Sequence, residues 1–397
     1  MTQDRKGRSG RRLRIALIAG EASGDVLGAS LIQAMVARHP DAEFFGIGGP
    51  KMMAAGLVSA YDQERLAVRG AVEVLSHLPE ILKIRRGIVA QLEAWKPDVM
   101  VGIDAPDFNL PIERRLKRAG IPTVHYVSPT VWAWRRGRAG KIVDAVNQLL
   151  CLFPFEPACY KGTGLEPVFI GHPLADEISP EINRSAQRTK LDLPEAAPLV
   201  TLMPGSRQSE LAFHAQLFVE TANRIAAELP EALFVVPLAT PATRDLFEAA
   251  LQTFAAPGLR VRILFGHARE ALAASDLALV CSGTATLEAA LLRCPMVITY
   301  RISALSAWIY KKMRYLPWVG LPNILLGRLL VPEWLQEDAT AEKLSEALID
   351  LWRAPTRRAE MAREFASIHQ KLRQDSAARA AEAVLACVRD EMPRNRD

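Results

Sequence analysis

Short runs of apolar residues alternate with stretches of helical periodicity along almost the whole chain. Residues 15–20, 97–104, 122–128 and 149–153 are predicted to be buried strands, and the residues after Gly24 repeat apolar positions at helical spacing. Apolar runs of this length are typical of parallel strands that helices cover on both faces. The pattern therefore predicts strand–helix–strand units and a parallel sheet.

The same pattern begins again after a polar stretch at residues 176–198. Strands are predicted at residues 199–203, 233–237, 259–264, 277–281 and 296–300, and the chain from residue 333 onward is predicted to be wholly helical. A chain of 397 residues exceeds what one core usually organises. We expect a disordered basic tail (1–12), a Rossmann-like domain (13–175), a second Rossmann-like domain (176–345) and C-terminal helices that pack back across the domains (346–397).

Composition excludes several classes of protein. The 49 Lys and Arg residues exceed the 44 Asp and Glu residues by only 5, so nucleic acid is not an expected partner. The five cysteines form no CxxC pair, which argues against a disulfide framework or a zinc site and fits the cytoplasm. No apolar run approaches the ~18 residues of a membrane span, although contact with a membrane surface stays open.

Ligands of open parallel sheets bind in the loops that follow the carboxyl ends of strands. The loop at residues 20–25, GEASGD, follows the first strand, and the next helix offers free N–H groups to an anion. Its candidate ligand contacts are Ser23, Gly24 and Asp25. The alternative is a tight turn in which Ser23 or Asp25 caps the helix. A second glycine turn is expected at residues 46–50.

Asp104 ends a predicted buried strand. A carboxylate there would be partly desolvated, and desolvation raises its pKa and makes it a better base. Asp104 is therefore the candidate general base, whereas Asp107 and Asn109 are expected to be helix caps more often than chemical groups.

The loop at residues 125–135 carries aromatic rings and hydroxyl groups after another predicted strand. Its tryptophans could form a wall against a sugar face, and we take His125, Ser128 and Trp134 as candidate sugar contacts. The alternatives are aromatic packing against the core and a purely structural His125.

Two loops of the second half suit a nucleotide diphosphate. Gly205, Ser206 and Arg207 open the first helix there, and a guanidinium gives charge-assisted bidentate bonds to phosphate. A second candidate cradle, Ser282, Gly283 and Thr284, follows a strand and begins a helix.

Glu288 lies one helical turn beyond Thr284, where a carboxylate can accept hydrogen bonds from ribose hydroxyls. The alternative is a capping box with Thr284 as the cap. No DxD motif or His/Asp cluster accompanies these loops, so we expect no metal and no cofactor. Arg207 and the helix N-termini would then neutralise the leaving diphosphate.

These motifs together resemble the lipid-A-disaccharide synthase family. The matching segments run in order from about residue 13 to residue 340: residues 20–25, 102–109, 125–134, 169–173, 203–207, 282–288 and 321–323. The resemblance implies an α/β, GT-B-like fold with two Rossmann-like, doubly wound domains and the active site in the cleft between them. It also implies that Asn323 joins the nucleotide site and that the loops of the first domain bind the acceptor.

The family joins UDP-2,3-diacylglucosamine to 2,3-diacylglucosamine 1-phosphate. The acceptor 6-hydroxyl attacks the anomeric carbon with inversion, which gives a β-1,6-linked disaccharide 1-phosphate and UDP. Its members work at the cytoplasmic face of the inner membrane of Gram-negative bacteria. The resemblance thus implies a peripheral membrane enzyme, and a homo-oligomer stays open.

The segment at residues 66–89 is the predicted membrane contact, because its apolar residues are flanked by cations. The part before Ile84 is the better candidate for lipid, and the part after it is the better candidate for the core. The predicted membrane contacts are Leu66, Val68, Val72, Leu75 and Leu78.

Two other functions stay open on the sequence alone. One is a different UDP-sugar enzyme on the same scaffold, such as another glycosyltransferase or a UDP-N-acetylglucosamine 2-epimerase. The other is a nucleotide-sugar-binding protein without turnover, which Asp104 argues against.

Overall fold

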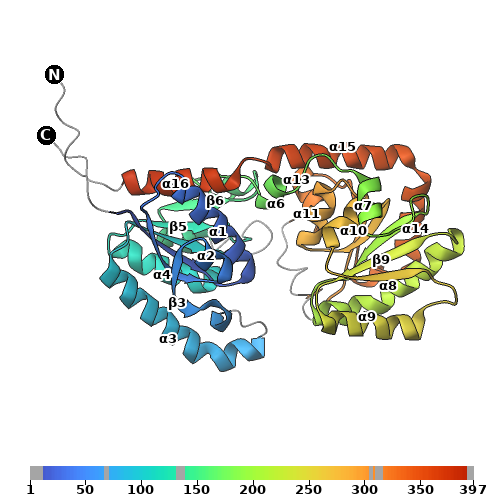
Figure 1. The fold of residues 1–397 in the computed structure, drawn as a ribbon, viewed down its shortest axis with the longest axis horizontal. Helices are drawn as coiled ribbons and strands as arrows, with labels where there is room; N and C mark the ends of the chain where they lie inside the picture. The colour runs from blue at the N-terminus through green and yellow to red at the C-terminus, as the bar shows by residue number, and fades with distance from the viewer. Residues whose placement is uncertain (1–11, 67–70, 131–138, 304–306, 309–315, 391–397) are drawn as a thin grey trace, which may run out of the picture. The chain divides into compact units, whose positions relative to one another are not determined.

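Two parallel β-sheets organise the chain, one in each of two units (Figure 1). The computed structural model describes residues 12–66, 71–130, 139–303, 307–308 and 316–390, with the side chains of 71–77, 389 and 390 excepted. Unit 1 comprises Met1–Pro173 and Arg373–Asp397, and unit 2 comprises Leu174–Leu372. The predicted tail at residues 1–12 therefore lies, except for Arg12, outside the described residues.

Seven strands form the sheet of unit 1 in the order β3-β2-β1-β4-β5-β6-β7, and all neighbouring strands are parallel. The strands are β1 (Arg14–Ala19), β2 (Glu43–Gly48), β3 (Leu57–Asp62), β4 (Val99–Ile103), β5 (Thr123–Tyr126), β6 (Gln148–Cys151) and β7 (Val168–Phe169). The strand order reverses between β1 and β4, so the loops that follow these two strands flank the crevice where such sheets bind ligands.

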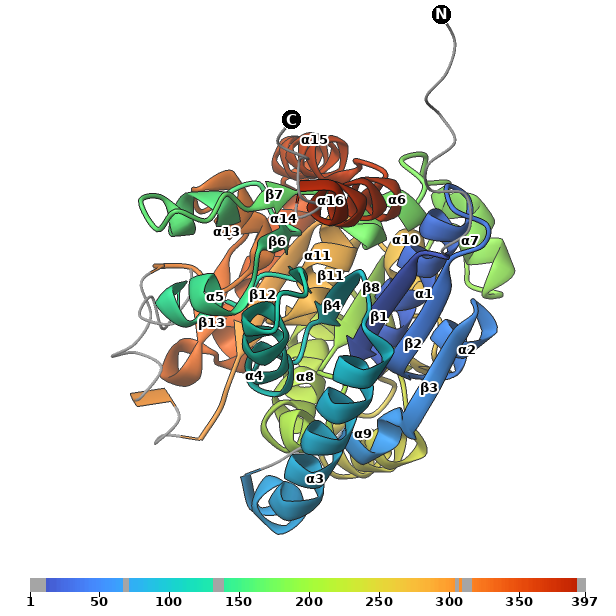
Figure 2. The same ribbon diagram turned by 90° about the vertical axis from the view of Figure 1, so that its left-hand side faces the viewer.

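The helices of unit 1 cover both faces of this sheet, with α1 and α16 on one face and α3 and α4 on the other (Figure 2). This explains why every residue of β4 and β5 is buried. The helices and 3-10 turns are α1 (Ala22–Val36), α2 (Pro50–Ala54), η1 (Gln63–Leu66), α3 (Ala71–Trp95), α4 (Pro106–Arg118), α5 (Ala139–Ala145), η3 (Glu156–Tyr160) and α16 (Ser376–Asp390).

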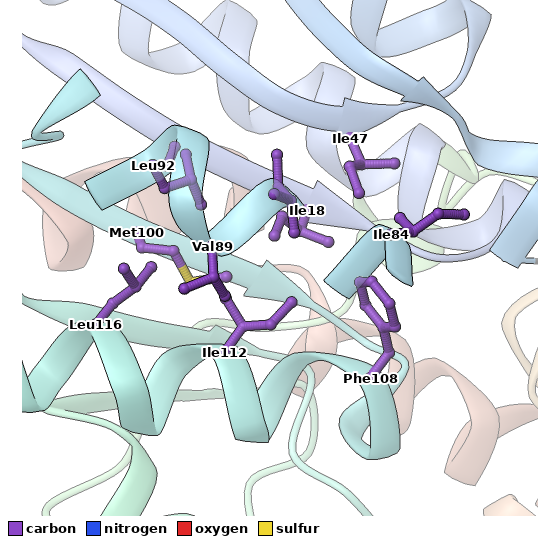
Figure 3. Packing of buried hydrophobic residues seen from close by; sticks show 11 residues of the cluster. Ile18, Ile47, Ile84, Val89, Leu92, Met100, Phe108, Ile112 and Leu116 are labelled. Atoms are coloured by element: carbon purple, nitrogen blue, oxygen red, sulfur yellow. The ribbon is translucent and has the colours of Figure 1, made fainter. Parts of the chain in front are cut away.

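The second half of α3 is part of the core of unit 1. Figure 3 shows strand residues packing against side chains of α3 and α4. Ile84, Ile88 and Leu92 are buried in this cluster. This confirms the predicted assignment of the part after Ile84 to the core, although Leu66 and Ile81, which precede Ile84, also pack against this cluster. The clustered residues labelled in Figure 3 are Ile18, Ile47, Ile84, Val89, Leu92, Met100, Phe108, Ile112 and Leu116.

The glycine turn predicted at residues 46–50 does close a strand, but it is shorter than predicted. Gly46 and Gly48 lie inside β2, and Gly49 is the N-cap of α2. Gly46 has a φ of 157°, and a Cβ there would lie 1.9 Å from the carbonyl oxygen of Leu17. The glycine is therefore required by the close approach of β2 to β1, which a sequence pattern does not distinguish from a turn.

Unit 2 repeats the strand order of unit 1, as β10-β9-β8-β11-β12-β13. The strands are β8 (Leu199–Met203), β9 (Leu233–Leu238), β10 (Val261–Phe265), β11 (Leu277–Cys281), β12 (Met296–Tyr300) and β13 (Glu333–Leu335). The order reverses between β8 and β11, so the two loops predicted to bind nucleotide flank this point.

The helices of unit 2 pack on both faces of its sheet, with α8, α9 and α14 on one face and α7, α10 and α11 on the other. The helices and the 3-10 turn are α6 (Pro173–Glu177), α7 (Arg184–Lys190), α8 (Gln208–Glu228), α9 (Pro241–Phe254), α10 (Ala268–Ala274), α11 (Thr284–Leu291), α13 (Leu321–Leu326), η4 (Gln336–Asp338), α14 (Ala341–Arg353) and α15 (Pro355–Leu372). Among the described residues, no helix is both long enough and apolar enough to cross a membrane.

The sequence predicted that the chain after residue 333 is wholly helical, and this prediction is wrong. Glu333–Leu335 is an edge strand that pairs in parallel with β12. Three residues are too few to show a strand period, so only the pairing reveals it. The helices that follow divide between the units, because α14 and α15 belong to unit 2 and α16 belongs to unit 1.

Candidate functional site

A hollow of about 530 Å³ opens at the carboxyl edge of the sheet of unit 2. Loops that follow β8, β9, β10 and β11 line this hollow, together with Tyr300 at the end of β12 and residues of α8 and α11. Seven of the eight residues predicted to bind nucleotide lie on its wall. They are Gly205, Ser206, Arg207, Ser282, Gly283, Thr284 and Glu288.

The loop after β11 presents the start of α11 to this hollow. Gly283 is the N-cap, with a φ of 152°, and Thr284 is the first helical residue. The alternative in which Thr284 caps the helix is therefore wrong. The carboxylate of Glu288 lies on the same wall and accepts a hydrogen bond from Nε of Arg269 at 3.1 Å.

Arg207 is the N-cap of α8, and its side chain is 61% exposed. Its Nη1 lies 3.4 Å from Oε1 of Glu210, which also lines the hollow. Glu210 was missed in the sequence. The spacing that could have identified it is visible, since a glutamate three residues after an N-cap is the capping-box position.

Asn323, the eighth residue predicted to bind nucleotide, does not line this hollow and has a structural role. Its side chain is fully buried, and its Nδ2 donates to the carbonyl of Val331 and to Oε1 of Glu333 at 2.8 and 2.7 Å. Its Oδ1 accepts from the N–H groups of Leu330 and Val331. The amide thus ties the end of α13 to the start of β13.

Tyr300 is a further wall residue that the sequence did not indicate. Its ring stacks on His214 with 5.6 Å between the ring centroids. His214 Nε2 accepts from the N–H of Arg301, which assigns the proton to Nδ1 and directs it to the carbonyl of Glu210. Burial lowers the pKa of His214, so a neutral imidazole supports the tyrosine.

Asp104 follows β4 in unit 1, where the backbone turns sharply. Asp104 and Ala105 have left-handed φ angles of 52° and 42°, a conformation that costs a non-glycine residue energy and gathers at functional sites. Burial raises the pKa of Asp104; Glu21 adds to the rise, whereas the backbone N–H of Ala105 and His125 oppose it. Asn109 Nδ2 donates to the carbonyl of Asp104 at 2.8 Å and holds this turn.

His125, a predicted acceptor contact, is fully buried and makes an internal contact. Its Nδ1 lies 2.7 Å from Oε1 of Glu113, whose side chain is also fully buried. Oε2 of Glu113 and Nε2 of His125 have no hydrogen-bond partner among the described residues. Gly102 makes the room for this pair, because a Cβ there would lie 2.0 Å from Oε1 of Glu113.

The carboxylate of Asp25 is likewise occupied within the fold. It accepts from the N–H groups of Gly49, Lys51 and Met52 at 2.9, 3.0 and 2.9 Å and so caps α2. Asp25 thus caps α2, whose N-cap residue Gly49 lies 24 residues further along the chain, and not α1, the helix that the capping alternative in the sequence suggested.

The other predicted acceptor contacts differ in their surroundings. Ser23 is exposed at the start of α1, and Gly24 is buried behind it. Ser128 is buried, and its Oγ lies 3.0 Å from the hydroxyl oxygen of Tyr160, so the structure places it in a hydrogen bond inside unit 1. Trp134 lies outside the described residues.

The predicted membrane contacts also divide. Leu66 is partly buried against the core cluster of unit 1, whereas Leu78 is 41% exposed. Val68 lies outside the described residues, as do the side chains of Val72 and Leu75. Among the described residues, no three His, Cys, Asp or Glu side chains gather as a metal site.

Comparisons with known proteins cover both units. The sequence profile of the lipid-A-disaccharide synthetase family matches residues 15–387, from β1 into α16. The lipid-A-disaccharide synthase of Chromobacterium violaceum is 54% identical over 377 residues, 95% of this chain and 98% of that protein. The enzyme of the same name from Dechloromonas aromatica is 52% identical over 380 residues, 96% of this chain and all of that protein.

The chain belongs to the lipid-A-disaccharide synthase family. The chain has the same fold as solved GT-B glycosyltransferases and related enzymes, which have two Rossmann-like domains. A UDP-GlcNAc 2-epimerase from Neisseria meningitidis, bound to UDP-GlcNAc, is 12% identical with a TM-score of 0.64, over 94% of this chain and 100% of that one. The kitacinnamycin glycotransferase is 18% identical with a TM-score of 0.63, over 96% and 100%. At these identities the likeness concerns the fold alone.

Proposed function

We propose that the protein transfers a diacylglucosaminyl group from UDP to 2,3-diacylglucosamine 1-phosphate, forming a β-1,6-linked disaccharide 1-phosphate and UDP. The observation that carries this proposal is the identity of 54% with a lipid-A-disaccharide synthase over nearly the full length of both chains. The epimerase alternative rests on a likeness in fold at 12% identity. The family relationship therefore favours the synthase over the two alternatives.

The proposed reaction is a single displacement in which the two units hold different substrates. In unit 1, the Asp104 carboxylate takes the proton of the acceptor 6-hydroxyl as that oxygen attacks the anomeric carbon of the donor. The bond from this carbon to the diphosphate oxygen breaks on the opposite face, which inverts the carbon. In unit 2, Arg207 and the N-terminus of α11 stabilise the negative charge of the departing UDP.

The hollow in unit 2 is the proposed UDP site. Arg207→Ala should raise the Kd for UDP by roughly 10- to 100-fold, because a hydrogen bond to a charged group is worth ~1.5–3 kcal/mol. Glu288→Ala should weaken binding by a smaller factor through the loss of a ribose contact. Isothermal titration calorimetry with UDP measures both effects.

Arg353→Ala is the matched control for this titration, because Arg353 pairs with Glu228 at the far end of α8 and lies outside the hollow. Its UDP affinity should equal that of the unchanged protein. If Arg207→Ala and Glu288→Ala both retained full affinity, the nucleotide would bind elsewhere.

We also propose that the start of α3 contacts a membrane surface, since the proposed substrates carry acyl chains. Leu78 is exposed there, and Lys83, Arg85 and Arg86 follow it. Cations near an anionic leaflet are worth ~1 kcal/mol each. This segment would let unit 1 reach lipid substrates without spanning the bilayer.

Leu75→Ser combined with Leu78→Ser should lower binding to anionic liposomes several-fold, because the proposed membrane contact loses two apolar side chains. UDP affinity should stay unchanged. Liposome sedimentation measures the binding to liposomes. The control is Leu246→Ser with Leu329→Ser, which changes two exposed leucines of unit 2. Equal sedimentation of the α3 variant and the control would place the docking surface elsewhere.

A further inference from the structure

The backbone N–H groups of the loop after β8, which is proposed to bind the nucleotide, donate to the carboxylate of Glu210. Oε2 of Glu210 accepts from the N–H of Ser206 at 2.9 Å and from the N–H of Arg207 at 3.3 Å. Oε1 lies 3.4 Å from Nη1 of Arg207. Two consecutive N–H groups and a guanidinium thus surround one anion, a donor set that also suits a phosphate group.

The loop is shaped around this carboxylate. Gly205 has a φ of 118°, and a Cβ there would lie 2.7 Å from Cβ of Glu210 and 2.8 Å from its Oε2. Glycine at this position therefore permits both the left-handed backbone and the approach of the carboxylate. Gly205 and Glu210 line the hollow proposed for UDP, as do Ser206 and Arg207.

Helix capping explains only part of this arrangement. In a capping box, the N3 glutamate accepts from the N–H of the N-cap residue, and Glu210 makes this bond to Arg207. The shorter bond, to Ser206, lies one residue before the N-cap. Glu210 and Tyr300 both line the hollow, and the charge of Glu210 adds to burial in raising the pKa of Tyr300.

We propose that Glu210 is a positioning residue that accepts from the diphosphate donors, holds them in place and is displaced from them when UDP binds. This proposal rests on the nucleotide site described under the proposed function. Because the diphosphate must displace a like charge from its own donors, Glu210 weakens UDP binding and thereby favours release of this product. The same donors stabilise the leaving group and then return to Glu210.

Glu210→Gln is the decisive substitution, since glutamine keeps the length and an acceptor oxygen but removes the charge. UDP should bind the full-length variant roughly tenfold more tightly in calorimetry, because a repulsion between neighbouring charges is lost. Uridine, which lacks the diphosphate, should bind both forms equally. Inhibition of turnover by UDP should strengthen by the same factor, an effect that loss of a helix cap alone would not produce.

Glu228→Gln, which makes the same charge change at the other end of α8, is the control and should leave UDP affinity unchanged. Weaker or equal UDP binding by folded Glu210→Gln overturns the proposal. Failure of UDP to bind the unchanged protein, or full affinity in Arg207→Ala and Glu288→Ala, would instead overturn the nucleotide site itself.

A structure of the unchanged protein with UDP provides a second test that does not depend on how the variant folds. The N–H groups of Ser206 and Arg207 should donate to phosphate oxygens, and the Glu210 carboxylate should have left them. A complex in which Glu210 still accepts from both groups beside bound UDP contradicts the proposal.

Discussion

Replacing Asp104 by Asn should lower kcat by about 10²- to 10⁴-fold, the usual contribution of a positioned general base. The amide keeps the size of the side chain but cannot take the proton of the acceptor hydroxyl. The backbone strain at Asp104 and Ala105 and the raised pKa of the carboxyl group both single out this turn. UDP release from saturating donor and acceptor, with circular dichroism to verify folding, measures the effect.

The pH profile of kcat gives the same assignment an independent check. A base must be ionised to act, so kcat of the unchanged enzyme should fall as the pH drops through the raised pKa of Asp104. The residual activity of Asp104→Asn should lack this acid limb. Asp107→Asn, at the exposed start of α4, serves as the comparison. Near-normal turnover in folded Asp104→Asn, with a loss in Asp107→Asn instead, would move the base to Asp107.

Replacing Glu113 by Leu should destabilise unit 1 by ~3–5 kcal/mol, because it leaves His125 fully buried without the carboxylate that it contacts. The unfolding transition of unit 1 should fall by roughly 6–20 °C, from the usual 2–4 °C per kcal/mol for a domain of this size. Differential scanning calorimetry of the full chain resolves this transition if the two units unfold separately, and the whole transition shifts if they do not.

The double variant Glu113→Leu with His125→Leu separates pairing from packing. Apolar residues of similar volume often replace a buried pair at little cost, so the double variant should be more stable than Glu113→Leu alone. If the two substitutions instead added their separate losses, the contact of 2.7 Å between His125 and Glu113 would contribute no coupling.

The strands were the most predictable part of the fold. The predicted segments 199–203, 277–281 and 296–300 match β8, β11 and β12 to the residue. Such runs are almost entirely apolar and largely buried, because helices cover both faces of the sheet. No strand segment was predicted for β2, β3, β7 or β13. Of these, β2 contains glycines, one of which closely approaches the neighbouring strand, whereas β7 and β13 have only two and three residues.

The site was predictable as a set of loops but not as a set of side-chain roles. Parallel sheets carry their ligand loops at the carboxyl ends of strands, so the loops after β8 and β11 followed from the pattern. Their residues line one hollow. The roles of Asp25 and His125 depend on partners 24 to 27 and 12 residues away, which only the folded chain brings together. Glu210 is the exception, because its capping-box spacing is visible in the sequence.

The most direct test of the central claim is mass analysis of the product formed from defined substrates. UDP-2,3-diacylglucosamine and 2,3-diacylglucosamine 1-phosphate, with acyl chains of different mass on each, should give one product that contains both pairs of chains. Its mass should equal the sum of the two substrates less UDP, and it should form only when both are present. Donor that is consumed to an epimerised or hydrolysed sugar, with no species carrying both pairs of chains, would contradict the account.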